Sequence, residues 1–251
     1  MKVEGFQLGG THLNKPVYSS NVKVLREQDL FYMGKKMVIN TKLSDNELLK
    51  AIYKAAFEYS KLIGNSYLVI GKNKNSGYFW FQCHFHEKYF MHLLGIASKT
   101  LSATEFYDKC DAFNKGLGSG ITISDCTPSR NHSRTTVNEK CSCCADMLRI
   151  QDAKYMKVGL KDKISQYVDF TYGYGNSATL GFKELGNSSF PITLIPQCID
   201  EFVSKRYKIV FVFQKEILDE KYKNILVEVK KGFFLEICNE LPDEIKNMCE
   251  I

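Results

Sequence analysis

Three of the five histidines lie in one short stretch, and their side chains are the ones best suited to proton transfer. They are His84, His86 and His92, with Lys88 between the last two. An imidazole titrates near neutral pH and can act as a general acid or base, and a lysine can stabilise the negative charge of a phosphate. A histidine at the edge of an apolar helix can instead be structural. These residue types and spacings therefore allow either acid–base chemistry or a structural role.

A strand followed by a short helix is expected to position these histidines. Apolar and polar residues alternate over residues 78–85, which predicts a strand with His84 on its more polar face. From His86 the apolar residues recur at helical spacing, and Gly95 keeps this helix short. The pattern assigns His84 to a strand and His86 to the junction. It places His92 at the edge of the buried helix face, and only His92 is predicted to be functional.

Four further side chains are candidates for holding a substrate strand. Tyr78 and Trp80 share the polar face of the predicted strand, where amphipathic rings can stack nucleobases. The alternative is that these two rings pack beneath a helix or another strand. A loop over residues 121–135 adds Arg130 and Arg134, which can bind phosphates.

The cysteines and histidines lack the spacing of a metal site. Two groups stand out in the sequence: Cys83, His84 and His86, and Cys141, Cys143 and Cys144. A structural zinc site takes four ligands, with two or more residues between paired cysteines. Neither group has this spacing, and Cys141 and Cys144 fit better as small apolar residues on a helix face. We therefore expect no metal and no cofactor.

Composition places the chain among ordinary globular proteins. It has 251 residues, 44% of them hydrophobic and 25% charged, and a net charge of +6, which permits contact with phosphates without requiring it. No apolar run approaches the roughly 20 residues of a membrane helix, and the first ten residues lack a secretory signal. Nine cysteines at irregular spacings indicate reduced thiols. We expect a cytoplasmic protein that does not contact membranes.

Capping boxes predict the starts of three helices, because each places a serine or threonine three residues before a glutamate. The three pairs are Ser44 with Glu47, Ser102 with Glu105, and Thr136 with Glu139. Strands are predicted at residues 67–71, 78–85, 155–158, 166–172, 178–182, 192–195, 207–213 and 224–229.

These elements predict an α+β fold, with N-terminal helices packed on a mainly antiparallel sheet of four to six strands. Residues 1–43 are expected to form an N-terminal extension with short strands. Residues 44–251 are expected to form one domain, because no repeat or low-complexity linker divides them.

Histidine, lysine, arginine and hydroxyl groups without an acidic metal cluster suit one chemistry in particular. Metal-independent RNA cleavage needs a base for the 2′-hydroxyl proton and an acid for the leaving 5′-oxygen. It also needs cations or hydroxyls around the phosphate. The residues present are compatible with this reaction, but the composition does not demand it.

A family resemblance favours that chemistry. Residues 90–95 follow the pattern Phe-x-His-Leu-x-Gly, and residues 102–107 follow Ser-Ala-x-x-Phe-Tyr. Together they resemble the opening motif of a phage-associated nuclease-like family in the Barnase–EndoU–colicin–RelE-like group. Shorter blocks at 178–182, 191–195 and 213–215 continue the order of that family, so the resemblance covers roughly residues 44–230.

The resemblance implies a ribonuclease core that belongs to a toxin or effector of a phage or mobile element. Carried over by position, it implies His92 as general base or acid, Lys88 and Lys215 as phosphate-neutralising cations, and Thr193 as a hydrogen-bond donor to the phosphate. The implied product end is a 2′,3′-cyclic phosphate. RNA is the expected partner, together with an antitoxin, an immunity protein, or another phage or host protein.

Two other functions remain open from the sequence. One is a non-enzymatic binding or inhibitor protein on the same fold, which predicts a buried, hydrogen-bonded His92. The other is a transferase acting on a nucleotide such as NAD, which predicts a deep pocket. The substrate sequence, the oligomeric state and the host do not follow from the sequence.

Overall fold

The computed structural model describes residues 39–160, 169–173, 178–201 and 203–250. Residues 36–251 cluster as one compact unit. The short strands predicted before residue 39, and the start of the strand predicted at 166–172, lie outside the described residues. The boundary of the N-terminal extension at residue 43 stays a prediction.

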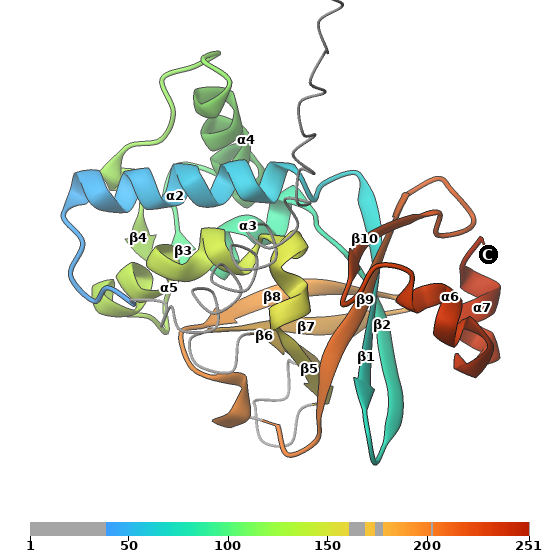
Figure 1. Ribbon diagram of the computed structural model, residues 1–251. Helices are drawn as coiled ribbons and strands as arrows, with labels where there is room; N and C mark the ends of the chain where they lie inside the picture. The colour runs from blue at the N-terminus through green and yellow to red at the C-terminus, as the bar shows by residue number, and fades with distance from the viewer. Residues whose placement is uncertain (1–38, 161–168, 174–177, 202, 251) are drawn as a thin grey trace, which may run out of the picture. The chain divides into compact units, whose positions relative to one another are not determined.

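Eight strands form one mixed sheet in the described part of the chain. Their bounds are β1 (Asn65–Asn73), β2 (Gly77–His84), β5 (Lys157–Leu160), β6 (Phe170–Gly173), β7 (Thr179–Leu185), β8 (Ser188–Ile195), β9 (Arg206–Glu216) and β10 (Asn224–Glu228). The order is β1-β2-β8-β7-β6-β5-β9-β10, and β1 also pairs with β9. Seven strands therefore close into a ring, and β10 joins the sheet by pairing with β9. In Figure 1, β7 and β8 run across the direction of β1, β2 and β9.

The α+β class predicted from the sequence is confirmed, but the strand count is higher than predicted. All eight predicted strand segments join the same sheet, so it has eight strands instead of four to six. Most neighbours are antiparallel; β2 and β8 run parallel, with Cys83 opposite Ser189. Periodicity identifies strands one at a time and carries no information on how many of them pair, which is why the count was wrong.

The sheet has two buried faces at β1 and β9. Tyr67 and Val69 point to the larger core, and Leu68 and Ile70 point to a second cluster on the outer face. The outer cluster lies against α6 (Phe233–Ile237) and α7 (Asp243–Met248), which Figure 1 places beside β1 and β2. Burial on both faces explains the nearly continuous apolar sequence of these two strands.

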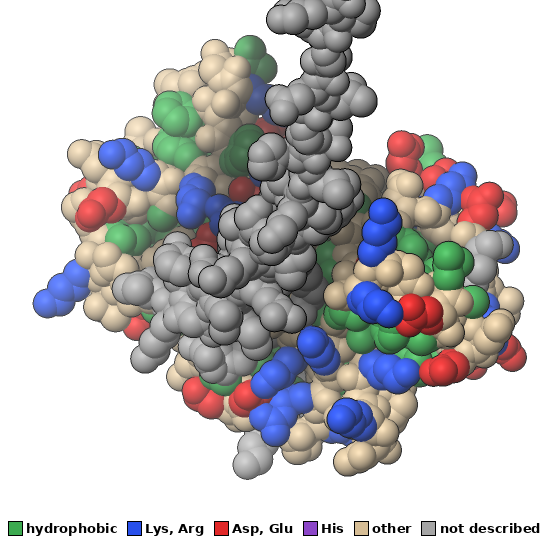
Figure 2. All heavy atoms as spheres, in the orientation of Figure 1, with side chains coloured by type: hydrophobic (Ala, Val, Ile, Leu, Met, Phe, Trp, Pro, Cys, Tyr) green, Lys and Arg blue, Asp and Glu red, His purple; other side chains and the backbone are tan. Residues whose placement is uncertain are grey.

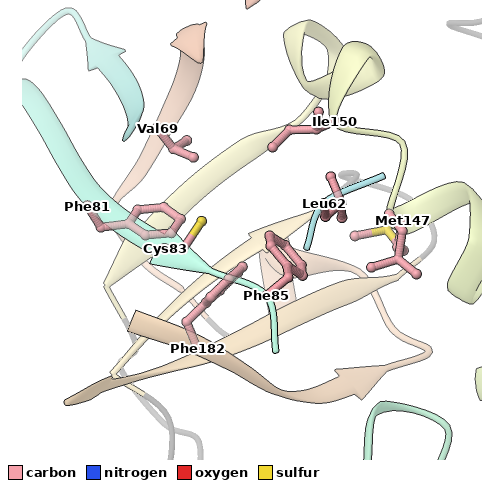
Figure 3. A pocket seen from close by; sticks show the side chains of 9 residues that line it. Leu62, Val69, Phe81, Cys83, Phe85, Met147, Ile150 and Phe182 are labelled. Carbon is pink, nitrogen blue, oxygen red and sulfur yellow. The ribbon is translucent and has the colours of Figure 1, made fainter. Parts of the chain in front are cut away.

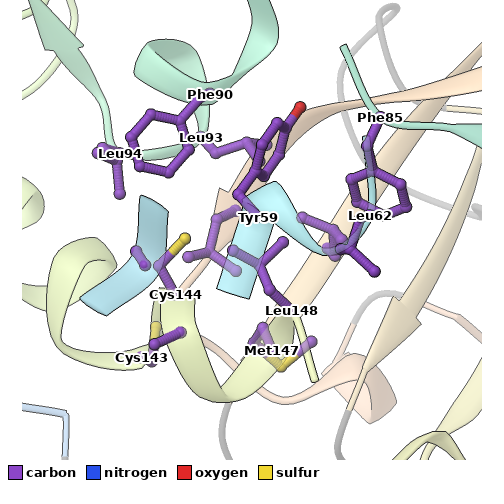
Figure 4. Close-up of a cluster of buried hydrophobic side chains, with 14 of the residues drawn as sticks. Tyr59, Leu62, Phe85, Phe90, Leu93, Leu94, Cys143, Cys144, Met147 and Leu148 are labelled. Atoms are coloured by element: carbon purple, nitrogen blue, oxygen red, sulfur yellow. The ribbon is translucent and has the colours of Figure 1, made fainter. Parts of the chain in front are cut away.

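Four helices cover the larger core: α2 (Asp45–Ser60), α3 (Glu87–Leu93), α4 (Ala103–Asn114) and α5 (Arg134–Met147). Figure 4 shows Tyr59 of α2 between the residues of α3 and those of α5. Tyr59 is fully buried, and its hydroxyl donates a 2.9 Å hydrogen bond to the carbonyl oxygen of His86. This bond fixes the start of α3, the helix that carries Lys88 and His92.

Two of the three predicted capping boxes are confirmed, at Ser44 and Ser102. The third prediction is wrong by one turn. The N-cap of α5 is Ser133, whose hydroxyl accepts a 3.1 Å hydrogen bond from the backbone N–H of Thr136. Ser133 and Thr136 are both good N-cap residues, so the local signal fits either start. Burial of Val137 in the first turn favours the earlier one.

The predicted apolar role of Cys141 and Cys144 is confirmed. Cys141, Cys143 and Cys144 are buried in the larger core, and burial raises the pKa of the Cys143 thiol to about 12. Across the described residues, no group of three or more His, Cys, Asp or Glu side chains could hold a metal ion. No helix in the described ranges is long and apolar enough to cross a membrane.

A small apolar cavity lies between the sheet and the helices. Figure 3 shows Phe81, Phe85 and Phe182 around it, with Leu62 and Met147 on the helical side. Its volume of about 10 Å³ is near the minimum that a water molecule requires. This cavity is therefore a packing defect of the core and not a substrate pocket.

Candidate active site

A hydrogen-bonded histidine lies where three strands meet on the outer face of the sheet. His84 is the last residue of β2; Ser66 lies opposite it on β1, and Ser188 begins β8. The imidazole Nε2 is 2.9 Å from the hydroxyl of Ser188 and 3.5 Å from that of Ser66. Within the described residues, Nδ1 has no hydrogen-bond partner. The ring is therefore held through one nitrogen, which leaves the other available for proton transfer.

A buried tyrosine supports this histidine from behind. The Tyr222 hydroxyl lies 2.6 Å from the Ser66 hydroxyl and donates a 3.0 Å hydrogen bond to Oε1 of Gln82. Tyr222 is 1% exposed, and burial raises its pKa well above the ordinary value for a phenol, so it stays protonated. His84, Ser66, Tyr222 and Gln82 thus form one connected network of neutral groups.

Lys215 adds a positive charge to this network. It lies opposite Ser66 on β9, and its Nζ is 5.1 Å from the centre of the Tyr222 ring. The ammonium group donates hydrogen bonds to the carbonyl oxygens of Asp219 (2.7 Å) and Glu220 (3.0 Å). In the part of the chain that the structure describes, it has no carboxylate partner.

Burial and the Lys215 cation together lower the pKa of His84 below its ordinary value of 6.5. Both effects disfavour the protonated imidazole, the first by removing water and the second by repulsion between like charges. His84 is therefore neutral at pH 7 and can accept a proton.

Two aromatic rings connect this network to helix α3. The ring of Phe190 on β8 is 5.9 Å from the His84 ring and 5.4 Å from the Tyr89 ring, measured between centroids. The Nζ of Lys88 lies 5.0 Å from the centre of the Tyr89 ring. The predicted cation Lys88 therefore borders the same surface as His84, although no direct contact joins them.

The other predicted catalytic residues are also accessible. His92 is exposed on α3, and Thr193 is half-buried on β8, the strand beside α3. Because the next residue, Leu194, points into the core, Thr193 points to the outer face of the sheet. The exposed His92 does not match the buried histidine that the binding-protein alternative predicts. Direct contacts among the predicted catalytic residues are absent from the described structure, so their joint role stays a prediction.

The loop with Arg130 lies against the end of α3. The backbone N–H of Ser129 donates a 2.9 Å hydrogen bond to the carbonyl of Gly95, and β3 (Ile96–Ala97) pairs with β4 (Thr127–Pro128). Arg130 is exposed in this loop. Arg134 forms a 2.8 Å ion pair with Asp45 at the start of α2, so contact with a substrate would compete with a bond between two helices.

Tyr78 and Trp80 follow the packing alternative. Both lie against the outer hydrophobic cluster that α6 and α7 cover. Alternation placed them correctly on the face opposite the phenylalanines, but it could not show that helices more than 150 residues later in the chain cover that face. Their contact with a substrate strand remains a prediction.

Nothing in the sequence marked Ser66, Ser188 or Tyr222 as functional residues. Serine and tyrosine are common in strands and loops, and no motif marks these three. Each lies within a few residues of the start of a predicted strand, a position that many other polar residues share. His84 was placed on the correct strand face, but its partner Ser188 is 104 residues away in the chain.

Comparison with protein families relates this sequence to a known group. The sequence model described as phage-Barnase-EndoU-ColicinE5/D-RelE like nuclease 4 matches residues 51–231. The chain belongs to this family. No curated protein and no solved structure matches it.

Membership of the phage-Barnase-EndoU-ColicinE5/D-RelE like nuclease 4 family confirms the resemblance predicted from residues 90–107. The matched range contains the network around His84, as well as Lys88, His92, Thr193 and Lys215. It ends before α6 and α7. The matched range thus includes every residue of this network and of the predicted catalytic set.

Proposed function

We propose that this protein is a metal-independent endoribonuclease that acts as a toxin or effector of a phage or mobile element. The proposal rests on one observation, the half-buried His84 that is hydrogen-bonded to Ser188 beside the Lys215 cation. A neutral imidazole at pH 7 is a suitable general base. Membership of a nuclease family supports phosphodiester cleavage as the reaction that this base serves.

The proposed reaction rearranges one phosphodiester of RNA. His84 takes the proton of the ribose 2′-hydroxyl, and the 2′-oxygen attacks the adjacent phosphorus to form a new P–O bond. The bond from phosphorus to the 5′-oxygen breaks, and an acid gives that oxygen a proton. The products are a 2′,3′-cyclic phosphate and a 5′-hydroxyl. Side chains carry both protons, so no step needs a metal ion.

The residues predicted from the sequence fill the remaining roles. His92 on α3 is proposed as the acid that protonates the leaving oxygen. Lys88 and Lys215 neutralise the charge on the phosphate, and Thr193 donates a hydrogen bond to it. His84 enters this scheme as the base.

The proposed biological role follows from the reaction. An enzyme that cleaves cellular RNA harms the cell that makes it, so we propose an antitoxin or immunity protein as its partner. The family description places these nucleases with phages, which supports a mobile-element origin.

The test is cleavage of a fluorescent RNA in the presence of EDTA. We expect fragments with cyclic-phosphate ends and no cleavage of DNA of the same sequence, since DNA lacks the 2′-hydroxyl. Equal cleavage of DNA, or loss of activity in EDTA, would exclude this mechanism. Absence of cleavage with strong thermal stabilisation by NAD would favour the transferase. Absence of both would favour the non-enzymatic binding protein.

A further inference from the structure

Three lysines form a row across the outer face of the sheet, at the other end of β9 from Lys215. Lys208 of β9 lies opposite Lys72 of β1 on one side and Lys157 of β5 on the other. Residues directly opposite on neighbouring strands point to the same face, and these strands are about 4.8 Å apart. We call Lys72, Lys208 and Lys157 the lysine row.

The central lysine of the row has no counter-charge. Lys72 forms an ion pair with Glu240 (3.2 Å), and Lys157 forms one with Asp200 (2.9 Å). Lys208 is exposed and, among the residues with a described position, its side chain makes no ion pair or hydrogen bond. Like charges directly opposite one another destabilise a sheet, so the fold gains nothing from this arrangement. An external anion would remove the repulsion.

The surroundings of the lysine row are also basic. Arg206 lies two residues before Lys208 and shares Asp200 with Lys157. Figure 2 shows Lys and Arg side chains gathered over β5, β9 and β1. Two carboxylates therefore face at least four cations. Both ion pairs of the row are partly exposed to solvent, which weakens them, so a phosphate can compete with them.

We propose that the lysine row binds backbone phosphates of the RNA several nucleotides away from the cleaved bond. This inference rests on the proposed function, because the polyanion is the same RNA. Lys208 and Lys215 are seven residues apart on β9, which corresponds to about 23 Å in an extended strand. A dinucleotide is too short to reach both, and phosphate contacts do not distinguish bases. The row therefore favours long substrates irrespective of sequence.

Binding can be measured without cleavage by using a fluorescent 2′-O-methyl RNA of about 15 nucleotides, which lacks the attacking hydroxyl. Fluorescence anisotropy at several salt concentrations gives the slope of log affinity against log salt. Each lost contact with single-stranded RNA reduces this slope by about 0.7. We expect that loss for Lys208→Gln and a larger one when Lys72→Gln is added. The control is Lys50→Gln on the exposed side of α2, with no expected change.

Three results would overturn the proposal. The first is a Lys208→Gln slope equal to that of the wild type, in a protein whose melting temperature is unchanged. The second is a wild-type protein that does not bind the RNA. The third is binding to polyglutamate but not to RNA, which would assign the row to an acidic protein.

Failure of the proposed cleavage reaction is a separate result, because the 2′-O-methyl RNA reports binding alone. If cleavage is present, Lys208→Gln should slow cleavage of a 15-nucleotide RNA several-fold and leave cleavage of a dinucleotide unchanged. A Lys208→Gln protein that loses activity on both substrates would contradict the lysine row as a remote site.

Discussion

Replacing His84 with glutamine tests the proposed site most directly. A glutamine side chain can hydrogen-bond to Ser188, as the imidazole does at 2.9 Å, but it cannot exchange a proton near neutral pH. Ser66 keeps its 2.6 Å contact with the Tyr222 hydroxyl, so the network behind the imidazole remains. The substitution removes proton transfer and changes few contacts.

The expected loss of activity is much larger than the loss of stability. A positioned general base contributes about 10²- to 10⁴-fold to the rate, or roughly 3–5 kcal/mol. We expect kcat/KM of His84→Gln to fall by at least about 100-fold. The variant loses at most about one hydrogen bond, worth about 1 kcal/mol, so its melting temperature should fall by only about 2–4 °C.

The pH dependence tests the electrostatic reasoning. A base acts in its unprotonated form, so kcat/KM should rise with pH and level off above the pKa of His84, which lies below 6.5. In Lys215→Met the cation that repels the proton is absent, so the pKa of His84 rises. The acid limb of the pH profile, where kcat/KM rises with pH, therefore moves to higher pH. His92→Gln is the matched control, since it removes the proposed acid and should leave the acid limb in place.

Initial rates on a fluorescent RNA between pH 5 and pH 9 decide the question. A His84→Gln protein that cleaves as fast as wild type would refute His84 as the base. An acid limb that does not move in Lys215→Met would refute the electrostatic link between the two residues. Loss of activity in His84→Gln with a large drop in melting temperature would show a structural role instead.

Three further predictions concern stability, measured by thermal unfolding. Ser133→Ala should cost about 1 kcal/mol because it removes the N-cap of α5, and Thr136→Ala should cost less. Gly71→Ala should cost about 1–3 kcal/mol or more, since the methyl would lie 2.7 Å from side chains of β5 and β9, whereas Gly118→Ala should be nearly neutral. Burial lowers the pKa of Lys140 from 10.5 to about 8, so the charged form destabilises the fold below pH 8. Lys140→Met should stabilise by up to roughly 3 kcal/mol at pH 7, with a gain that shrinks as pH rises from 8 to 10.5. Equal effects of the two cap variants, equal effects of the two glycine variants, or a pH-independent gain would contradict these assignments.

Local signals in the sequence predicted most of the secondary structure. The capping boxes at Ser44 and Ser102 mark the observed helix starts, and alternation over residues 78–85 gave the face of each side chain in β2. These signals are reliable because helix capping and the alternation of side chains in a strand depend on residues that are close together in the chain. The predicted start of α5 was wrong because Ser133 and Thr136 are both suitable N-cap residues. Packing of Val137 decides between them.

Long-range pairing decided what local signals left open. The ring of seven strands depends on the β1–β9 and β2–β8 contacts, which join segments far apart in the chain. Packing of the C-terminal helices covers Tyr78 and Trp80, and a contact between α2 and α5 pairs Arg134 with Asp45. From the sequence, these side chains were expected to be free to contact a substrate. The pattern of apolar and polar residues is the same whether a polar face is exposed or covered.

By itself, the sequence determined the α+β class, the strand that carries His84, and a family motif around His92. Only the tertiary structure showed that Ser66, Ser188 and Lys215 meet at the end of that strand. The reason is physical: the pKa of His84 depends on burial and on the charge of Lys215, and both come from strands distant in sequence. Residue type gives an imidazole the capacity to transfer a proton, and its folded surroundings determine whether it is neutral at pH 7.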